Sequence, residues 1–193
     1  MKIGITGSIA CGKSTICRYL QSKGYTVIDT DKLSYSLTTK GNLCYNDIVQ
    51  FFGKEILLET GEIDRKKLGN IVFNDKRKKE ELEKIIHPHI RRAIEDYNDE
   101  EIVFFEVPLL YESHMGNLFY KVITVYAKED LQIKRLMERN NISLEEAINR
   151  INNQMNVKEK IKRADYVIDN SKTLEESFKQ IDNIMKGLKQ YEI

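Results

Sequence analysis

The 193-residue sequence predicts an α/β fold, in which a five-stranded parallel sheet is covered on both faces by helices. Five short β-rich runs are almost continuously apolar, as strands buried on both faces of a parallel sheet are. Segments with helical periodicity lie between these runs, and alternating strands and helices are typical of a doubly wound sheet. The predicted strands are 2–6, 26–29, 102–107, 121–127 and 166–169.

Helical patterns occupy the segments between the predicted strands. Residues 13–22 follow the first strand, and an apolar stripe with a 3.6-residue period runs from Leu82 to Tyr97, where Pro88 predicts a kink or a restart. Ser143 and Thr173 each stand three residues before a glutamate, which is the capping-box pattern of a helix N-terminus. Residues 32–98 hold no convincing strand and are too long for a plain crossover, so we expect a helical insertion there.

The composition excludes several classes of protein. With 41% hydrophobic and 32% charged residues the chain is expected to be soluble and globular, and 31 Lys and Arg against 30 Asp and Glu exclude a generally basic nucleic-acid binder. Cys11, Cys17 and Cys44 are too few for a disulfide framework, which favours a reducing cytosol. The longest apolar run, 102–111, is too short to span a bilayer. We therefore expect a cytoplasmic protein with no nucleic-acid, membrane or obligate protein partner.

A phosphate-binding loop stands between the first strand and the first helix. Residues 7–14 match the pattern G-x4-G-K-S in the strand–loop–helix context that this motif requires. Glycines at both ends let successive N–H groups surround an anion, and the helix N-terminus adds partial positive charge. Lys13 is expected to reach the β- and γ-phosphates of ATP, and the Ser14 hydroxyl to bind Mg²⁺. The residues predicted to bind ATP here are Ala10, Cys11, Gly12, Lys13, Ser14 and Thr15.

Cys11 lies within this loop, close to the N-terminus of the first helix. A thiolate is favoured at such a position because the helix dipole and nearby cations stabilise its negative charge. We therefore expect alkylation of Cys11 to abolish activity, and we expect bound nucleotide to protect the thiol.

A small kinase fits this loop better than a nucleotide-dependent switch does. A GTP-dependent switch also carries a D-x-x-G segment and an N-K-x-D or T-K-x-D segment that reads the base. The chain has no D-x-x-G segment, and its one Thr-Lys pair, Thr39-Lys40, is followed by Gly and Asn. A switch or nucleotide-binding protein stays the alternative from another class. A kinase needs in addition a carboxylate near the acceptor and cations around the transferred group.

Three carboxylates are candidates for the acceptor side of such a site. Asp29 and Asp31 follow the second strand, and ligands of parallel sheets bind at the carboxyl ends of the strands. Asp31 is the candidate base for an attacking hydroxyl, with a helix N-cap as its structural alternative. Asp29 is a candidate to organise the metal or the loop. Glu106 ends an apolar strand and is expected to bind substrate or a Mg²⁺-bound water, unless it forms a buried structural hydrogen bond.

The candidate cations lie on two consecutive helices. Arg135 and Arg139 are four residues apart and share one helix face. Arg150 follows on the next helix, and the turn at 140–143 lets the two helices fold back. Arg139 and Arg150 are therefore expected to converge on the transferred phosphoryl group, whose developing charge needs such cations. A solvated basic face is the structural alternative.

In their order along the chain, these motifs resemble those of the dephospho-CoA kinase family. The phosphate-binding loop is common to many families, whereas the succession of D-x-D, His-Pro, V-P-L-L and A-D-x-V-I-D-N is much more specific. The resemblance covers nearly the whole chain and is carried by residues 6–15, 27–31, 63–68, 71–73, 86–88, 107–110, 150–154 and 164–170.

The resemblance implies a three-layer P-loop kinase fold that transfers the γ-phosphoryl group of ATP to the ribose 3′-hydroxyl of dephospho-CoA, with Mg²⁺ as cofactor. It implies a nucleotide-binding core at 1–31, 99–127 and 164–193, a helical acceptor domain at 32–98 and a helical lid at 128–163. ATP and dephospho-CoA are then the expected partners. A P-loop kinase for another nucleotide or hydroxyl acceptor stays the alternative.

The resemblance also gives single residues a role. Asp31 matches the base of the family, and together with Lys13 and Arg139 it forms the predicted catalytic set. The family often has Asp where Glu106 stands and Ala where Thr30 stands. The further residues predicted near the nucleotide are Arg139, Arg150, Gln154 and Asn170, and those predicted near the acceptor are Asp31, Arg65, His87, Pro88 and Glu106. A metal site at His87 and His89 lacks a third ligand of suitable spacing, and we expect His89 and His114 to lie at the surface or to have satisfied hydrogen bonds.

Overall fold

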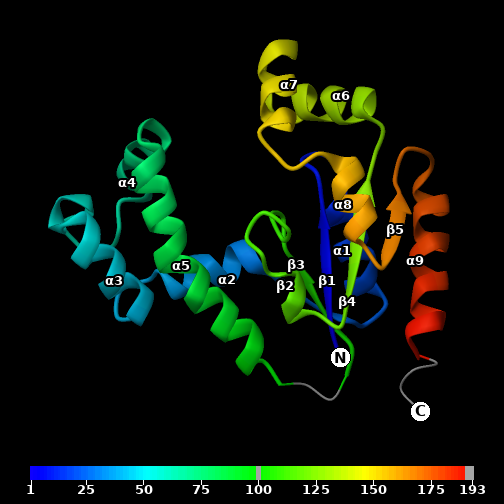
Figure 1. Ribbon diagram of the computed structural model, residues 1–193, viewed down its shortest axis with the longest axis horizontal. Coiled ribbons are helices and arrows are strands. Elements are labelled where there is room, and N and C mark those ends of the chain that lie inside the picture. Colours follow the sequence, from blue (N-terminus) through cyan, green and yellow to red (C-terminus); the bar gives the residue numbers. More distant parts are fainter. Residues whose placement is uncertain (99–100, 190–193) are drawn as a thin grey trace. The chain divides into compact units, whose positions relative to one another are not determined.

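The computed structural model describes residues 1–98 and 101–189 (Figure 1). The chain divides into two compact units, which we call the sheet unit (Met1–Ile28 and Asp99–Ile193) and the helical unit (Asp29–Asn98). Residues 99–100 and 190–193 of the predicted nucleotide-binding core lie outside the described residues. The division into acceptor domain and lid stays a prediction.

The sheet has five parallel strands in the order β2-β3-β1-β4-β5, which confirms the predicted fold class. The central strand β1 pairs in parallel with β3 and β4, and β4 pairs in parallel with β5. The carboxyl ends of these strands therefore lie at one edge of the sheet, where ligands of such folds bind. The strands are β1 (Lys2–Gly7), β2 (Thr26–Asp29), β3 (Val103–Glu106), β4 (Lys121–Tyr126) and β5 (Tyr166–Asp169).

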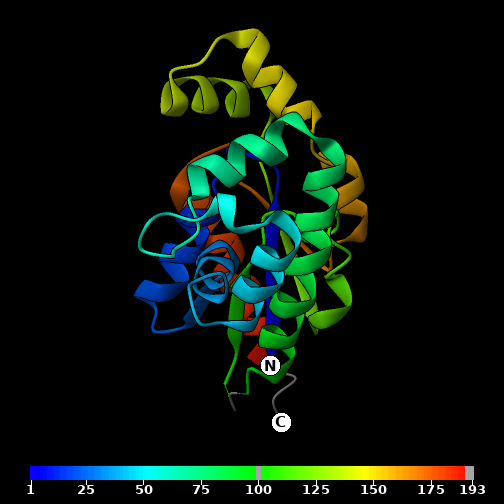
Figure 2. The ribbon, with the colours of Figure 1, turned by 90° about the vertical axis from the view of Figure 1, so that its left-hand side faces the viewer.

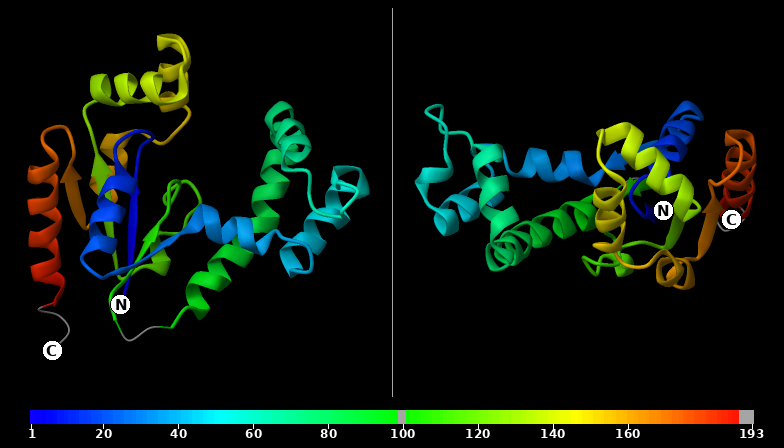
Figure 3. Two further views of the ribbon diagram at one scale, coloured as in Figure 1. Left: turned by 180° about the vertical axis from the view of Figure 1, so that it is seen from behind. Right: turned by 90° about the horizontal axis from the view of Figure 1, so that it is seen from above.

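Helices cover both faces of this sheet, which explains why the inner strands are almost continuously apolar. Helices α1 (Lys13–Ser22) and α9 (Leu174–Lys189) lie on one face, and α8 (Val157–Arg163) lies on the other (Figures 1 and 3). The rings of Tyr19 and Phe178 stack with centroids 4.0 Å apart and join α1 to α9. Ile3, Ile5 and Phe104 have no exposed surface and form the centre of the core.

Two further helices of the sheet unit, α6 (Glu129–Asn140) and α7 (Leu144–Asn152), pack against each other. The chain reverses between them at Asn141, whose φ of 51° is in the left-handed region that ends many helices. The Ser143 hydroxyl accepts the N–H of Glu146 and caps α7, as the sequence predicts. A short 3₁₀ helix, Gly116–Leu118, precedes β4.

The helical unit contains α2 (Thr30–Leu37), α3 (Leu43–Phe52), α4 (Arg65–Asn74) and α5 (Lys76–Asp96) (Figure 2). A 3₁₀ helix at Lys54–Ile56 and one isolated bridge, Leu57 to Ile63, are its other regular features. The unit has its own apolar core, formed by Cys44, Tyr45, Ile48, Phe52, Ile56, Ile63 and Leu68.

The predicted restart at Pro88 is wrong, because α5 continues through Pro88 from Lys76 to Asp96. A proline removes one backbone hydrogen bond and crowds the preceding turn. Helix α5 contacts α2, α3 and α4 along its length, and this packing compensates for the missing bond. None of the helices among the described residues combines the length and the apolar character that crossing a membrane requires.

Candidate active site

The phosphate-binding loop connects the end of β1 to the start of α1, and its two glycines have conformations that other residues rarely adopt. Gly7 has a φ of 154° and Gly12 a φ of 92°. A side chain at Gly7 would overlap the carbonyl group of Val125, and one at Gly12 would overlap the amide of Asn170. Close packing therefore requires glycine at both ends of the loop.

A cavity of about 390 Å³ lies over this loop, and its lining is strongly cationic. Four basic side chains and the loop itself surround the cavity, so it suits a polyanion such as a nucleotide phosphate chain. The ammonium of Lys13 is shared between the carbonyl oxygens of Gly7 and Ser8, each 3.3 Å away. The lining residues are Ala10, Gly12, Lys13, Ser14, Thr15, Arg18, Arg135 and Arg139.

Two arginines of the cavity have contacts that fix their guanidinium groups. Arg135 donates from Nη2 to the carbonyl oxygen of Asn170 at 3.2 Å, while its buried Nη1 has no hydrogen-bond partner among the described residues. Arg18 was not predicted from the sequence, and its Nη2 lies 3.4 Å from Oγ1 of Thr15. Arg18 stands three and four residues after Thr15 and Ser14 on α1, and this helical spacing is the signal that identifies it.

Ser14 and Glu106 form a hydroxyl–carboxylate pair at the edge of the loop. The Ser14 hydroxyl donates to Oε1 of Glu106 at 2.9 Å, which joins the start of α1 to the end of β3. Both groups supply the hard oxygen atoms that Mg²⁺ prefers. The pair therefore suits a magnesium ion bound together with nucleotide phosphates.

Asn170 fastens the loop after β5 to the phosphate-binding loop. The side chain is buried, and its Nδ2 donates to the carbonyl oxygen of Cys11 at 2.8 Å while its Oδ1 accepts the hydroxyl of Ser177 at 2.9 Å. These bonds hold the two loops together, and a contact of Asn170 with adenine stays a prediction.

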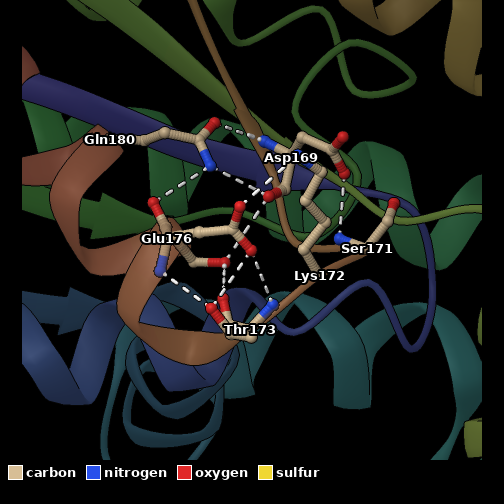
Figure 4. Close-up of polar contacts among 7 residues, drawn as sticks. Asp169, Ser171, Lys172, Thr173, Glu176 and Gln180 are labelled. Atoms are coloured by element: carbon tan, nitrogen blue, oxygen red, sulfur yellow. Dashed lines mark hydrogen bonds and ion pairs between the residues drawn. The ribbon is translucent and has the colours of Figure 1, made fainter.

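The start of α9 is held by a reciprocal capping box (Figure 4). The Thr173 hydroxyl accepts the N–H of Glu176 at 3.2 Å, and the Glu176 carboxylate accepts the N–H of Thr173 at 3.2 Å. Asp169 accepts the N–H of Ser171 at 2.9 Å, and Gln180 donates to the Asp169 carbonyl oxygen at 3.0 Å. The loop that follows β5 is therefore rigidly attached to α9.

The expectation of a reactive thiol at Cys11 is wrong. The side chain has no exposed surface and belongs to the core beneath the loop, where it lies against Gly7. Burial raises the pKa of the Cys11 thiol, and the charges of Lys13 and Lys160 oppose this only in part. The backbone N–H of Cys11 donates to the carbonyl oxygen of Ser8 at 3.3 Å, and its sulfur atom does not line the cavity.

Gln154 and Arg150 have contacts that the sequence did not indicate. Oε1 of Gln154 accepts the N–H of Ile9 in the phosphate-binding loop at 2.8 Å. Arg150 donates to Oε1 of Glu146 at 2.6 Å on its own helix, and it is not among the described residues that line the cavity. The structure thus brings Arg139, but not Arg150, to the rim of the cavity.

In the helical unit, Asp29 and not Asp31 caps α2. Oδ1 of Asp29 accepts the N–H groups of Asp31 at 2.9 Å and Lys32 at 3.1 Å. The N-cap alternative for Asp31 is therefore excluded, because the helix begins at Thr30 and Asp31 lies in its first turn.

Other predicted acceptor residues are also part of the helical unit. The guanidinium of Arg65 lies 3.7 Å from the centre of the Tyr35 ring and donates to Oγ1 of Thr38 at 2.9 Å. His87 and Pro88 lie in the middle of α5. His89 is a satisfied residue, as expected, since its Nε2 is 2.8 Å from Oδ2 of Asp47.

Comparison with known proteins identifies the family. The model of the dephospho-CoA kinase family matches residues 1–176. A dephospho-CoA kinase of Listeria innocua is 44% identical over 185 residues, which cover 93% of this chain and 92% of the relative. The chain belongs to the dephospho-CoA kinase family. Dephospho-CoA kinases carry out the last step of coenzyme A synthesis, so this chain is a kinase.

Solved structures agree with membership of the dephospho-CoA kinase family. The dephospho-CoA kinase of Campylobacter jejuni is 38% identical with a TM-score of 0.73, and the match covers 97% of this chain and 99% of that one. A crystal structure from Thermus thermophilus is 32% identical with a TM-score of 0.81 and covers 97% of both chains. The P-loop kinase fold and the resemblance seen in the sequence motifs are thereby confirmed.

Proposed function

We propose that this chain transfers the γ-phosphoryl group of ATP to the ribose 3′-hydroxyl of dephospho-CoA, giving coenzyme A and ADP. The observation that carries the proposal is the cationic cavity over the phosphate-binding loop in a chain of this family. Phosphoryl transfer depends mainly on positioning and on stabilisation of negative charge, and a loop of N–H groups with several cations supplies both. We further propose that the protein acts in the cytoplasm.

The nucleotide phosphates are the natural occupants of the cavity. The N–H groups of residues 10–15 and the ammonium of Lys13 would neutralise the β- and γ-phosphates. Arg139 stands at the cavity rim and would stabilise the charge that develops on the transferred group. Arg18 adds positive charge beside Thr15, where we expect the α-phosphate, and Arg135 adds positive charge beside Asn170.

Ser14 and Glu106 are the residues that would hold Mg²⁺. The described residues contain no group of three or more His, Cys, Asp or Glu side chains arranged for a metal ion. Magnesium that accompanies a nucleotide commonly uses only one or two protein oxygens, with phosphates and water completing the shell, so the Ser14–Glu106 pair fits. Bound there, the ion would screen the phosphate charge while the protein residues orient the nucleotide.

Asp31 is the proposed base for the acceptor hydroxyl. The Oδ1 atom of Asp29 is engaged by two N–H groups of α2, which favours Asp31 as the carboxylate that orients the 3′-hydroxyl and takes its proton. We propose Arg65, His87 and Pro88 as acceptor contacts and Arg150 and Asn170 as nucleotide contacts, on the basis of their place in the family motifs.

An acceptor panel tests the proposed function. The purified protein is incubated with Mg²⁺, ATP and one of dephospho-CoA, AMP, dTMP or GMP, while ADP release is followed and products are identified by mass spectrometry. We expect acceptor-dependent ADP release with dephospho-CoA and a product heavier by one phosphate group. A clear preference for another acceptor would support a different P-loop kinase. Tight ATP binding without acceptor-dependent ADP release would support a switch or binding protein.

A further inference from the structure

Lys160 is a lysine with no exposed surface, and the proposed reaction gives it no role. It lies in α8, and its Nζ is 2.8 Å from Oε1 of Glu112 in the segment after β3. A buried ammonium is unfavourable without a counter-charge, so the Glu112 carboxylate is essential to this arrangement. We call Glu112 and Lys160 the buried pair after its lysine, although the Glu112 side chain itself is 24% exposed.

The buried pair is connected to the phosphate-binding loop through two adjacent residues. The same Oε1 atom of Glu112 accepts the N–H of Met155 at 3.1 Å. Gln154, the residue before Met155, accepts the N–H of Ile9 through its side-chain Oε1 at 2.8 Å. Residues 154–155 lie in the segment that joins α7 to α8. This segment is therefore bonded to Glu112 through Met155 and to the phosphate-binding loop through Gln154.

The loop needs such support at this point. Ala10, directly after Ile9, has a φ of 58°, a left-handed conformation that residues with a Cβ atom seldom adopt. Such conformations persist only where surrounding contacts enforce them.

We propose that Glu112 and Lys160 are positioning residues for ATP binding, which act through Met155 and Gln154 on the backbone of the phosphate-binding loop. The inference rests on the proposed function only in taking ATP as the nucleotide. Its physical basis is that a buried ion pair has few alternative arrangements, so it fixes the Met155 N–H and with it the Gln154 side chain.

A second ion pair of the sheet unit provides a matched control. Lys121 lies 2.9 Å from Oδ1 of Asp165, and Oδ2 of Asp165 accepts the N–H of Val122 at 2.8 Å. Like the buried pair, it joins a lysine, a carboxylate and a backbone N–H, but it lies where β4 and β5 begin. The phosphate-binding loop follows the carboxyl end of β1, at the opposite end of the parallel sheet. Lys121→Met therefore removes an ion pair without touching the loop, although this pair is more exposed, with side chains 32% and 35% exposed.

The test is a double-mutant cycle read by calorimetric titration with ATP. Glu112→Ala and Gln154→Ala are each expected to weaken ATP binding about tenfold, the effect of losing one effective hydrogen bond. The double variant is expected to bind ATP about as tightly as the single variant with the lower affinity, because both changes release the contact between Gln154 and Ile9. Lys121→Met is expected to lower the melting temperature and to leave ATP affinity unchanged.

Two results would overturn the inference: a folded Glu112→Ala protein with wild-type ATP affinity, or effects that multiply in the double variant. If Glu112→Ala does not fold, Glu112→Leu combined with Lys160→Met replaces the pair by apolar groups that cannot accept the Met155 N–H, and wild-type ATP affinity in that protein would overturn the inference equally. The titration uses no acceptor. A wild-type protein that binds ATP and fails on dephospho-CoA would therefore contradict the proposed function alone.

Discussion

Side chains of the phosphate-binding loop point either into the cavity or into the core. Lys13 and Ser14 line the cavity, whereas Cys11 is buried beneath the loop. Gly7 and Gly12 have positive φ angles, which let the backbone turn sharply at both ends of the loop. Residues of one short motif therefore have different roles, and their chemical reactivity differs accordingly.

The first prediction is that Cys11 is unreactive in the native protein. Burial raises the pKa of its thiol and excludes reagents from the sulfur atom, so iodoacetamide at about pH 8 should not modify it. Peptide mapping by mass spectrometry measures the modification, with a urea-unfolded sample as the positive control. Labelling of native protein at the rate seen in urea would show that the thiol is exposed.

The second prediction concerns His87 and acid stability. Burial lowers the pKa of His87 below its ordinary value of 6.5, and the charge of Glu83 opposes this only in part. As the pH falls below about 6.5, the unfolded chain binds a proton before the folded chain does, so the free energy of unfolding decreases. This contribution is fully present above that pH and is lost between it and the folded-state pKa.

Urea unfolding at about pH 7.5 and 5.5 measures this effect in wild type and in His87→Gln. The variant has no imidazole to protonate, so its unfolding midpoint should fall less on acidification than that of the wild type. An equal fall in both proteins would show that His87 does not contribute to acid sensitivity.

Helix α6 and the segment after α7 contribute two kinds of group near the phosphate-binding loop, namely charged side chains and a hydrogen-bond acceptor. Arg135 and Arg139 of α6 contribute charge to the cavity, and Gln154 after α7 contributes a hydrogen bond to the loop. One part of the chain therefore lines the cavity and also supports the phosphate-binding loop.

The third prediction tests the contribution of α6. Arg139→Ala should lower turnover by roughly 10²-fold while ATP affinity changes much less, because a cation placed at the transferred group acts mainly on charge that develops during reaction. Steady-state kinetics and ATP titration separate the two effects. Arg150→Ala serves as a comparison, since Arg150 is paired with Glu146 on α7. Unchanged turnover with weaker ATP binding in Arg139→Ala would show that Arg139 contacts bound ATP but does not stabilise the transition state.

The strands and most helices could be predicted because their signals are local. Continuous apolar runs predicted all five described strands to within a residue at either end, and the helix at Lys13–Ser22 was predicted with its observed ends. Of the two alternatives at Pro88 the restart is wrong, because the packing of α5 against three other helices outweighs a local break, while a kink stays a prediction. Contacts between distant parts of the chain leave no local signal.

In the candidate site, too, local features could be predicted and contacts between distant residues could not. The phosphate-binding loop was predictable from its glycine spacing, and Arg18 was missed although helical spacing places it beside Thr15. The contact of Gln154 with Ile9 spans 145 residues and could not be inferred from either segment alone. The direction of the Cys11 side chain depends on which face of the loop meets the core, and the motif itself does not specify this.

The chain carries the phosphate-binding loop in its sheet unit and Asp31 in its helical unit. The fourth prediction is that Asp31→Asn lowers turnover by roughly 10²–10⁴-fold, the usual contribution of a general base, with little change in ATP affinity. Asp29→Asn is the control, and it should mainly destabilise α2, whose first N–H groups Asp29 accepts. An inactive Asp29→Asn beside an active Asp31→Asn would assign the base to the other carboxylate.

The most direct test of phosphoryl transfer to the 3′-hydroxyl is the rate of ADP release from ATP with dephospho-CoA and with its 3′-deoxy analogue. The two acceptors differ by one oxygen atom, so they should bind alike, and only the first has the proposed nucleophile. We predict acceptor-dependent ADP release with dephospho-CoA and only the acceptor-free rate with the analogue. Equal release with both compounds would show that the phosphoryl group goes to another atom or to water, and would contradict the proposed reaction.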